Sequence, residues 1–205
     1  MNWYDENVAP RLIGAVCSWG RFDRWRREAT AGLAGTVLEI GFGNGQNLGF
    51  YPPAVERVLA VEPSPVAWAA ARERVAQFPG TVELVGDDAA RLELADASCD
   101  HVVSTFTLCS VGDLGRAARE IARVLRPGGT VRLVEHGLAP SPRMARWQWR
   151  LDGIEQRLAG GCHLTREPVG ALERAGLAGR WSRAGYAVGP SPWSYVTIAE
   201  LERPR

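Results

Sequence analysis

The chain has 205 residues, a formal net charge of +1 at pH 7 and 46% apolar residues, which suits one globular domain with a full hydrophobic core. This near-neutral balance argues against a dedicated nucleic-acid binder, for which a clustered basic face is expected. All 24 Lys and Arg residues are arginine, and the missing lysine excludes a P-loop lysine, a pyridoxal Schiff base and the Tyr-x-x-x-Lys pair of short-chain dehydrogenases.

The first 33 residues are predicted to form a helical lid in front of a core that spans residues 34–205. Apolar and aromatic side chains recur there at spacings that suit one or two helices packed over the mouth of a ligand site. They are Trp3, Tyr4, Val8, Leu12, Ile13, Trp19, Phe22 and Trp25. We interpret the arginines at positions 21, 24, 26 and 27 as a solvated helix face rather than a membrane or phosphate patch.

A short strand followed by a glycine-rich loop is the most informative stretch. Residues 36–40 are rich in β-formers, and Gly41, Gly43 and Gly45 follow, where glycine allows positive φ and lets backbone N–H groups approach a ligand. The alternative is a purely steric role, in which the glycines only allow a tight turn into a helix over residues 46–51. A dinucleotide fingerprint needs glycine at position 46, where Gln46 stands, so a nicotinamide or flavin cofactor is disfavoured.

The second predicted strand, residues 57–61, is followed by Glu62, which lies about 20 residues after Gly41. An acid at this distance binds the hydroxyl groups of a ribose in doubly wound folds. Its charge also repels a 2′-phosphate. The sequence therefore favours a ligand with an unphosphorylated ribose.

Strands and helices alternate from residue 36 to residue 136, which is typical of a parallel sheet with crossover helices. Ser64-Pro65 begins a helix that ends at Pro79-Gly80, and Asp113 caps a second helix that ends at residues 126–129. The other strands are expected at residues 82–85, 101–105 and 131–135. Because ligands bind beyond the carboxyl ends of such strands, one edge should gather several candidate side chains. They are Gly41, Glu62, Asp88, Thr105, Glu135 and His136.

Beyond this alternation the sequence predicts a helix over residues 144–158, a short helix over residues 169–175 and strands at residues 179–188 and 193–201. The strands would complete a seven-stranded sheet with an antiparallel last hairpin. Met144, Trp147, Leu151, Ile154 and Leu158 form one apolar stripe, which we expect to pack in the core rather than to form an acceptor or dimer surface. A homodimer stays open.

Several motifs in this order resemble the class I S-adenosylmethionine-dependent methyltransferases. They are Glu39-Ile-Gly-Phe-Gly-Asn-Gly45, Glu62-Pro63, Gly86 to Ala89 and Leu125-Arg-Pro-Gly-Gly129. The resemblance implies an α/β fold, a Rossmann-like doubly wound seven-stranded sheet. It also implies that S-adenosylmethionine is the cofactor and S-adenosylhomocysteine the product.

The resemblance further implies where the cofactor binds. The glycine loop would lie against its methionine part, with Glu39 near the amino group, and Glu62 would hold the ribose hydroxyls. Asp88 would accept from the adenine amino group, Ala89 would donate its backbone N–H to the ring, and the loop after Thr105 would flank the methyl group. The implied cofactor-binding residues are Glu39, Gly41, Gly43, Gly45, Asn47, Glu62, Pro63, Asp88, Ala89 and Thr105.

Further motifs resemble the methyltransferase-like 7 family and its bacterial relatives, whose animal members are membrane-anchored and methylate small alkyl thiols. They are Ser104 to Val111, Val134-Glu-His136, Trp147-Gln148 and Gly160 to Arg166, together with Asn47 and Tyr51-Pro52. We expect no membrane anchor in this chain, and His163 stands where the animal members are expected to carry cysteine.

His136 is the first candidate for a general base because it ends the fifth strand beside the expected cofactor, and His163 is the second. Asp88 is a third if it does not bind adenine. Equally open is a structural role, in which His136 hydrogen-bonds a loop and His163 caps the next helix. Two further functions also remain open: a protein that binds the cofactor without turnover, and a methyltransferase acting on a quinone or phenol at carbon or oxygen.

The cysteines predict no metal site. Cys17, Cys99, Cys109 and Cys162 form no C-x-x-C pair, so neither a zinc knuckle nor a disulfide framework is expected, and Cys109 and Cys162 are interpreted as small buried hydrophobes. No apolar run reaches the length of a membrane span and the first thirty residues lack a signal-peptide core. We therefore expect a cytoplasmic protein with no stable membrane anchor.

Overall fold

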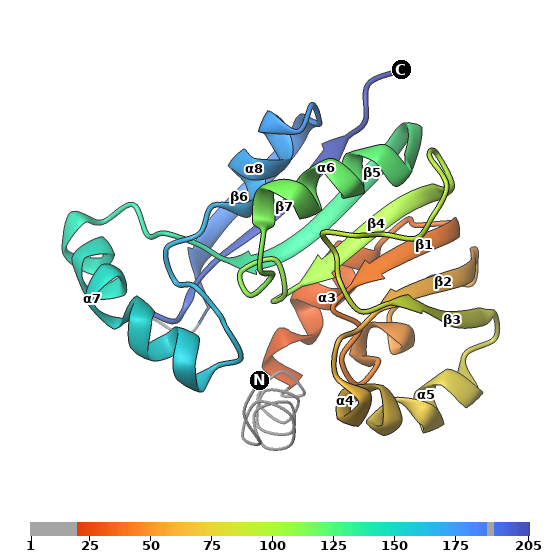
Figure 1. Ribbon diagram of the computed structural model, residues 1–205, viewed down its shortest axis with the longest axis horizontal. Coiled ribbons are helices and arrows are strands. Elements are labelled where there is room, and N and C mark those ends of the chain that lie inside the picture. The colour runs from red at the N-terminus through yellow and green to blue at the C-terminus, as the bar shows by residue number, and fades with distance from the viewer. Residues whose placement is uncertain (1–19, 188–190) are drawn as a thin grey trace.

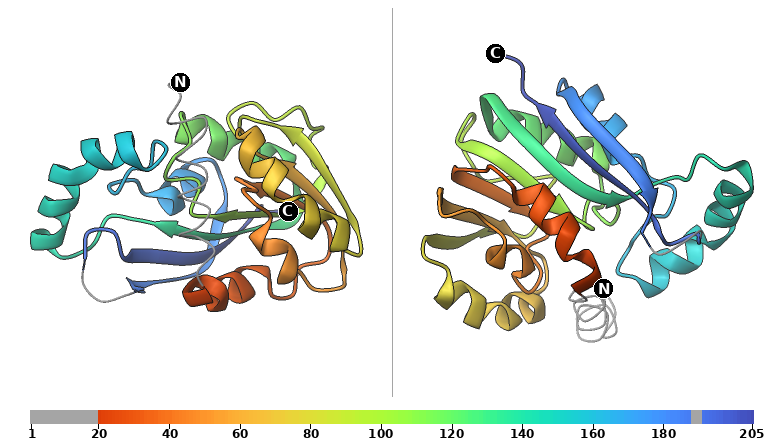
Figure 2. Two further views of the ribbon diagram at one scale, coloured as in Figure 1. Left: turned by 90° about the horizontal axis from the view of Figure 1, so that it is seen from below. Right: turned by 180° about the vertical axis from the view of Figure 1, so that it is seen from behind.

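The computed structural model describes residues 20–187 and 191–205, which form a seven-stranded sheet with helices on both faces (Figures 1 and 2). The helical elements are η1 (Gly20–Phe22), α3 (Asp23–Thr30), η2 (Gln46–Gly49), α4 (Pro65–Ala70), α5 (Arg72–Gln77), α6 (Leu114–Val124), α7 (Pro142–Leu158) and α8 (Pro168–Arg174). The strands are β1 (Gly35–Ile40), β2 (Val55–Val61), β3 (Thr81–Gly86), β4 (Cys99–Thr105), β5 (Leu125–His136), β6 (Ala178–Tyr186) and β7 (Tyr195–Glu202).

The strand order is β3-β2-β1-β4-β5-β7-β6, which confirms the predicted Rossmann-like doubly wound sheet. The first five strands in this order are parallel, and β7 is antiparallel to both β5 and β6. The order reverses between β1 and β4, and open α/β sheets bind their ligands at such a switch point.

Alternating side chains of the central strands fill two hydrophobic layers. Leu38 and Ile40 of β1 belong to the layer beneath α6 and α8, whereas Val37 faces the layer that includes Ala71, next to α4 and α5. This period of two is what a strand buried on both faces requires. Packing on both faces holds the strands in position, and with them the edge of the sheet where their carboxyl ends lie.

Helix α3 covers the sheet on the face opposite α6. Trp25 and Ala29 pack against Val134 of β5 and Ile198 of β7. The predicted solvated arginine face is correct for Arg24 and Arg27, which are exposed, and wrong for Arg26, whose exposed fraction is 5%. Residues 1–19 of the expected lid lie outside the described residues, so that part of the lid stays a prediction.

Several boundaries differ from those that the sequence predicts. The helix expected over residues 46–51 is a single 3₁₀ turn, η2, and the helix expected from Ser64 to Pro79 is divided into α4 and α5 at Ala71. Ser64 does cap α4, because its hydroxyl accepts the Ala67 N–H at 3.2 Å. Strand β5 begins at Leu125, earlier than expected, with a register shift against β4.

Helix α7 does not pack as predicted. Trp147, Ile154 and Leu158 of the apolar stripe are 47%, 55% and 60% exposed, and Trp149 beside them is 63% exposed. The helix projects away from the sheet (Figures 1 and 2). It is buried instead through Gln148 and Asp152. An apolar period shows which side chains share a helix face but not whether a neighbouring element covers that face.

Within the described ranges, no helix combines the length and the apolar character that a membrane crossing requires.

Candidate functional site

The register of the sheet brings the predicted strand-end residues to one edge. Ile40 of β1 pairs with Val61 of β2 and with Ser104 of β4. The next residues along the chain are therefore neighbours: Gly41, Glu62 and Thr105. Val61 in turn lies beside Gly86 of β3, so the loop with Asp88 and Ala89 follows at the same edge. Parallel strands that end together make this convergence unavoidable.

The glycine loop is built from residues with positive φ. Gly41, Gly43 and Gly45 have φ values of 72°, 58° and 75°. The N–H groups of Gly41 and Phe42 both donate to the Val61 carbonyl, at 2.9 and 3.1 Å, so the alternation of the strand ends after β1. Only glycine adopts this left-handed conformation without a steric cost.

Gly41 leaves no space for a side chain, because a Cβ atom there would lie 2.0 Å from Thr107 Oγ1 and 2.3 Å from its Cγ2. We expect Gly41→Ala to destabilise the fold by roughly 3 kcal/mol, from left-handed strain and overpacking together, and to abolish cofactor binding. Gly49→Ala is the matched control, since no atom lies within 4 Å of its added Cβ. Urea unfolding of both variants measures the difference, and equal stabilities would contradict the loop geometry.

Glu62 is held in place by the backbone around it. The Gly43 N–H donates to its Oε2 at 2.6 Å and the Ser64 N–H donates to its Oε1 at 2.8 Å. Burial raises the pKa of Glu62, and these two amide bonds lower it in part. Glu62 as a whole is 9% exposed at the end of β2. It is therefore fixed in one orientation with only a small part of its surface open to a ligand.

Glu39 lies beneath the loop in a buried polar network. Its Oε1 accepts from Asn47 Nδ2 at 2.9 Å and its Oε2 from the Tyr51 hydroxyl at 2.7 Å. Arg26 Nη1 donates to Asn47 Oδ1 at 2.8 Å and to Thr105 Oγ1 at 3.2 Å. Glu39 is 1% exposed. The network joins α3, β1, η2 and β4, so it fixes the floor of the site.

This network makes stability depend on pH. Burial raises the pKa of Glu39 to about 7, despite the hydrogen bonds and the Arg26 charge that lower it. The folded state therefore binds a proton that the unfolded chain has already lost, and stability falls as the pH rises from about 4.5 to about 7. We expect the unfolding free energy of the protein, relative to Glu39→Gln, to fall by about 2 to 3 kcal/mol between pH 5 and pH 8. Urea unfolding at both pH values tests this, and a constant difference would contradict it.

The loop after β3 carries the other predicted cofactor residues. Asp88 is exposed and its Oδ1 accepts the Ala90 N–H at 2.8 Å, which closes the turn that buries Ala89. Pro63 is exposed next to Glu62. Asp88 and Pro63 thus lie on two successive strand-end loops at the same edge of the sheet.

Glu135 holds the loop that follows β4. It is fully buried, and its Oε1 accepts from the Ser104 hydroxyl at 2.6 Å and from the N–H groups of Thr107 and Leu108 at 3.0 Å each. Its Oε2 receives a longer bond, of 3.4 Å, from the Cys109 N–H. The sequence predicts Glu135 at the edge where the ligand binds. In the structure its carboxylate oxygens instead accept hydrogen bonds that hold the loop after β4 in place.

Phe106 begins that loop in a strained conformation, with φ of 56°. Its N–H donates to the Val134 carbonyl at 2.7 Å, and its ring packs on Phe22 and His136 with centroids 5.0 and 5.3 Å away. A bulky residue with positive φ persists only where its surroundings determine the backbone, and such positions gather at functional sites.

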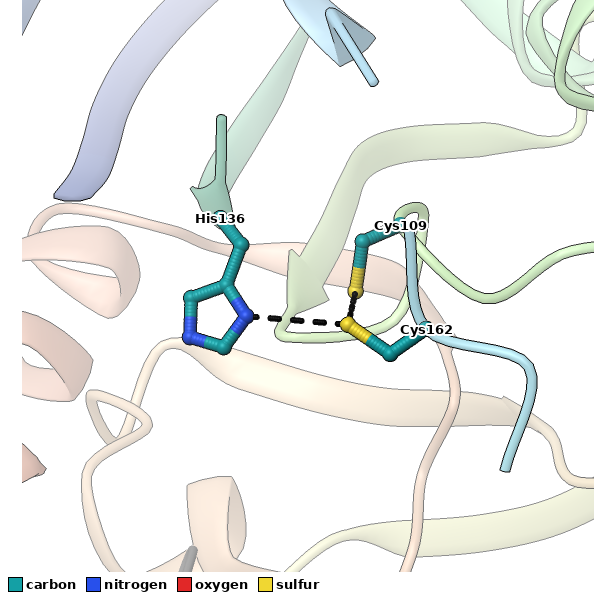
Figure 3. A group of neighbouring side chains, drawn as sticks. All are labelled: Cys109, His136 and Cys162. Atoms are coloured by element: carbon teal, nitrogen blue, oxygen red, sulfur yellow. Dashed lines mark hydrogen bonds between the residues drawn. The ribbon is translucent and has the colours of Figure 1, made fainter. Parts of the chain in front are cut away.

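His136 ends β5 and faces two thiols. Its Nδ1 lies 3.7 Å from Cys162 Sγ, and Cys162 Sγ lies 3.3 Å from Cys109 Sγ (Figure 3). Burial lowers the pKa of His136, but the Cys109 thiol and nearby negative charges raise it more, so the net shift is upward. The predicted interpretation of Cys109 and Cys162 as buried is confirmed, since they are 1% and 6% exposed. Their proximity to His136 is not visible in the sequence.

His163 forms a pair with Asp152 of α7. Its Nδ1 lies 3.2 Å from Asp152 Oδ2, and the other oxygen of Asp152 accepts the Leu164 N–H at 2.7 Å. Burial raises the pKa of Asp152, but bonds from Gln156, His163 and Leu164 lower it below its usual value. The alternative in which His163 caps the next helix is wrong, because the N-cap position of α8 is Glu167 and no side chain caps it.

Two buried polar residues that support the site, Arg26 and Gln148, are not predicted from the sequence. Arg26 is read as solvated from its own segment, whereas its partner Asn47 lies 21 residues away. Gln148 is 1% exposed and anchors α7 to the end of β5, since it accepts the Ala139 N–H at 2.8 Å and donates to the Gly137 carbonyl at 3.0 Å. The Trp147-Gln148 motif was the only signal for it.

Known proteins share both the sequence pattern and the fold. A family described as "Methyltransferase domain" matches residues 38–133. Human thiol S-methyltransferase TMT1A is 41% identical over 149 residues, which cover 70% of this chain and 60% of the human protein. Mouse thiol S-methyltransferase TMT1B is 38% identical over 175 residues, covering 82% of this chain and 69% of the mouse protein. The chain thus spans between three fifths and seven tenths of the length of these relatives.

A solved structure supports the fold assignment. The crystal structure of a SAM-dependent methyltransferase from Methanosarcina mazei superimposes with a TM-score of 0.66 at 20% identity, covering 82% of this chain and 92% of that one. At this identity the likeness concerns the fold alone.

Proposed function

The chain belongs to the methyltransferase family that includes the animal thiol S-methyltransferases TMT1A and TMT1B, and we propose that it transfers a methyl group from S-adenosylmethionine to a small thiol. The observation that carries the proposal is the fixed carboxylate of Glu62 beside the glycine loop. Each of its oxygens accepts one backbone N–H, which leaves each a lone pair for one hydroxyl of a ribose.

The cofactor is a sulfonium cation with no phosphate, and the site suits it. The loop from Gly41 to Gly45 would take the methionine part. Because Glu39 is 1% exposed and lies beneath the loop, it would act through its hydrogen bonds to Asn47 and Tyr51 rather than by direct contact with the cofactor. Thr105 and Asn47, which belong to the hydrogen-bond network around Glu39, would also face the methionine part of the cofactor.

The adenine would lie between the loops after β2 and β3. The Asp88 Oδ1 atom is used by Ala90, and among the described residues Oδ2 has no hydrogen-bond donor, so it is available to the adenine amino group. Ala89 would supply a backbone N–H to the ring and Pro63 would border it. Asp88 is then committed to adenine and is not the general base.

Methyl transfer is an in-line displacement at carbon, so the protein must hold the acceptor sulfur at about 3 Å from the methyl group and exclude water. The loop that Glu135 fixes, from Phe106 to Ser110, would flank the methyl group. A thiolate is the reactive form of the acceptor. His163, oriented by Asp152, is the proposed general base. His136, which contacts Phe106 and Cys162, would line the side of the site where the acceptor binds.

A methyl-transfer assay tests the function. Purified protein with labelled S-adenosylmethionine is incubated with small alkyl thiols, phenols, amines and quinols, and thioether and S-adenosylhomocysteine are measured. We expect methylation of thiols. Methylation of quinols or phenols alone would make the protein a C- or O-methyltransferase. Cofactor binding in calorimetry without methyl transfer to any acceptor would make it a binding protein, and tighter binding of NAD would reject the cofactor assignment.

The base has its own test. We expect His163→Gln to lower kcat for alkyl thiols by about 100-fold, the lower part of the range for general bases, with no change in cofactor affinity. The loss should shrink for an acidic aromatic thiol, which ionises without help. His101→Gln is the matched control, because His101 bonds to Thr130 on the sheet at 2.8 Å. An equal loss for both thiols would assign His163 a structural role only.

A further inference from the structure

Cys109, His136 and Cys162 come from three segments and point toward one another (Figure 3). Cys109 lies in the loop after β4, His136 at the end of β5 and Cys162 in the loop between α7 and α8. Their ligand atoms all lie within 4.8 Å of one another. In a tetrahedral zinc site with bonds of about 2.3 Å to sulfur and about 2.0 Å to nitrogen, ligand atoms are roughly 3.5 to 3.8 Å apart. The sulfurs, 3.3 Å apart, are about 0.5 Å closer than in such a site, and the 3.7 Å from Cys162 Sγ to His136 Nδ1 is close to the expected sulfur–nitrogen separation.

We propose that Cys109, His136 and Cys162 bind a thiophilic cation of the zinc class. Two thiols and one imidazole are soft and borderline ligands, which select zinc-like ions over magnesium or calcium. Binding breaks two S–H bonds and forms two metal–sulfur bonds, and the two protons pass to water. A dication with two thiolates and a neutral imidazole has no net charge, so the complex suits its buried setting.

The surrounding backbone already holds two of the ligands. The Cys109 N–H bonds to buried Glu135, and the Cys109 carbonyl accepts the His163 N–H at 2.9 Å, which ties the loop of Cys109 to the residue next to Cys162. The Phe106 ring packs against the His136 imidazole. Metal ligands are typically oriented by such contacts. Among the described residues the group has three members, so one tetrahedral position is left for a further ligand.

The first test measures metal directly. Protein purified with a reductant is loaded with Zn²⁺ and dialysed, and its zinc content is measured by mass spectrometry. We expect about one zinc per chain. Loss of any one ligand should lower zinc affinity by more than about 100-fold in Cys109→Ser, Cys162→Ser and His136→Ala. Replacing a residue that only hydrogen-bonds to a zinc ligand already lowers metal affinity by about 10- to 100-fold. Cys99→Ser is the matched control, because Cys99 is buried at the start of β4, whereas the loop of Cys109 follows the other end of this strand.

A second measurement needs no variant. Co²⁺ added to the wild-type protein should give intense thiolate-to-cobalt charge-transfer bands and tetrahedral ligand-field bands, and Zn²⁺ should displace them. Wild-type protein that retains no zinc and shows no such bands would overturn the proposal. A second outcome would also overturn it: the mass measured without reductant shows a Cys109–Cys162 disulfide, and the protein still binds no zinc after that disulfide is reduced. Metal content and cobalt spectra are measured without cofactor or acceptor, and methyl transfer is measured on the wild-type protein, so the metal site and the proposed function can fail separately.

Discussion

Replacing Glu62 with alanine is expected to lower the affinity for S-adenosylmethionine by roughly 100-fold, or about 3 kcal/mol. The variant loses both charge-assisted bonds to the ribose hydroxyls. It also frees the N–H groups of Gly43 and Ser64, which Glu62 accepts at 2.6 and 2.8 Å, so the glycine loop loses its link to β2. Calorimetric titration with the cofactor and with its demethylated product measures the effect.

Two further variants make the result specific. Glu62→Gln keeps one oxygen acceptor but presents an NH₂ group to one of the two backbone donors, so its affinity should lie between those of the wild type and Glu62→Ala. Glu83→Gln changes an exposed acid on neighbouring β3 whose ion pair, within the described residues, is with Arg57, and it should bind the cofactor as the wild type does. Unchanged affinity in a folded Glu62→Ala variant would remove the ribose assignment, and with it the proposed cofactor site.

The fold and one edge of the site follow from patterns that are local in the sequence. Alternating strands and helices, the positive-φ glycines at residues 41 to 45, and the caps of Ser64 and Asp113 each depend on neighbours within a few residues. Asp113 Oδ1 does accept the Arg116 N–H, at 2.9 Å. Once the strands are parallel, the convergence of Gly41, Glu62 and Thr105 follows from topology alone. The resemblance to known methyltransferases adds the cofactor that is expected there.

The features that the sequence does not reveal depend on distant partners. Arg26 looks like a surface residue because its helix is amphipathic, yet Asn47 and Thr105 bind it inside the site. The stripe of α7 looks like a core face, but Trp147, Ile154 and Leu158 are not covered by any part of the chain that the structure describes. The group of Cys109, His136 and Cys162 has no ligand spacing of a known motif, since its members belong to three loops or strand ends. The cytoplasmic location and the possible homodimer remain predictions from the sequence.

Replacing Glu135 with alanine is expected to give the largest loss of stability, about 4 kcal/mol or more. Glu135 is fully buried and accepts from four donors: the Ser104 hydroxyl and the N–H groups of Thr107, Leu108 and Cys109. Each buried donor that loses its acceptor costs about 1 to 3 kcal/mol, less where water enters the cavity. The loop would also lose its fixed conformation beside the methyl group, so kcat should fall even in the fraction that is folded.

The geometry of Glu135 supplies a sharper comparison with glutamine. Three of the four donors bind Oε1, and Oε2 receives only the 3.4 Å bond from Cys109. A glutamine that keeps its oxygen at the Oε1 position therefore retains the three shorter bonds, and we expect Glu135→Gln to cost less than about 2 kcal/mol. Ser104→Ala, which removes one donor, should cost about 1 kcal/mol. Urea unfolding of the three variants gives their order, and methyl-transfer rates should follow it. If glutamine and alanine destabilise equally, the negative charge of Glu135 rather than its Oε1 acceptor holds the loop.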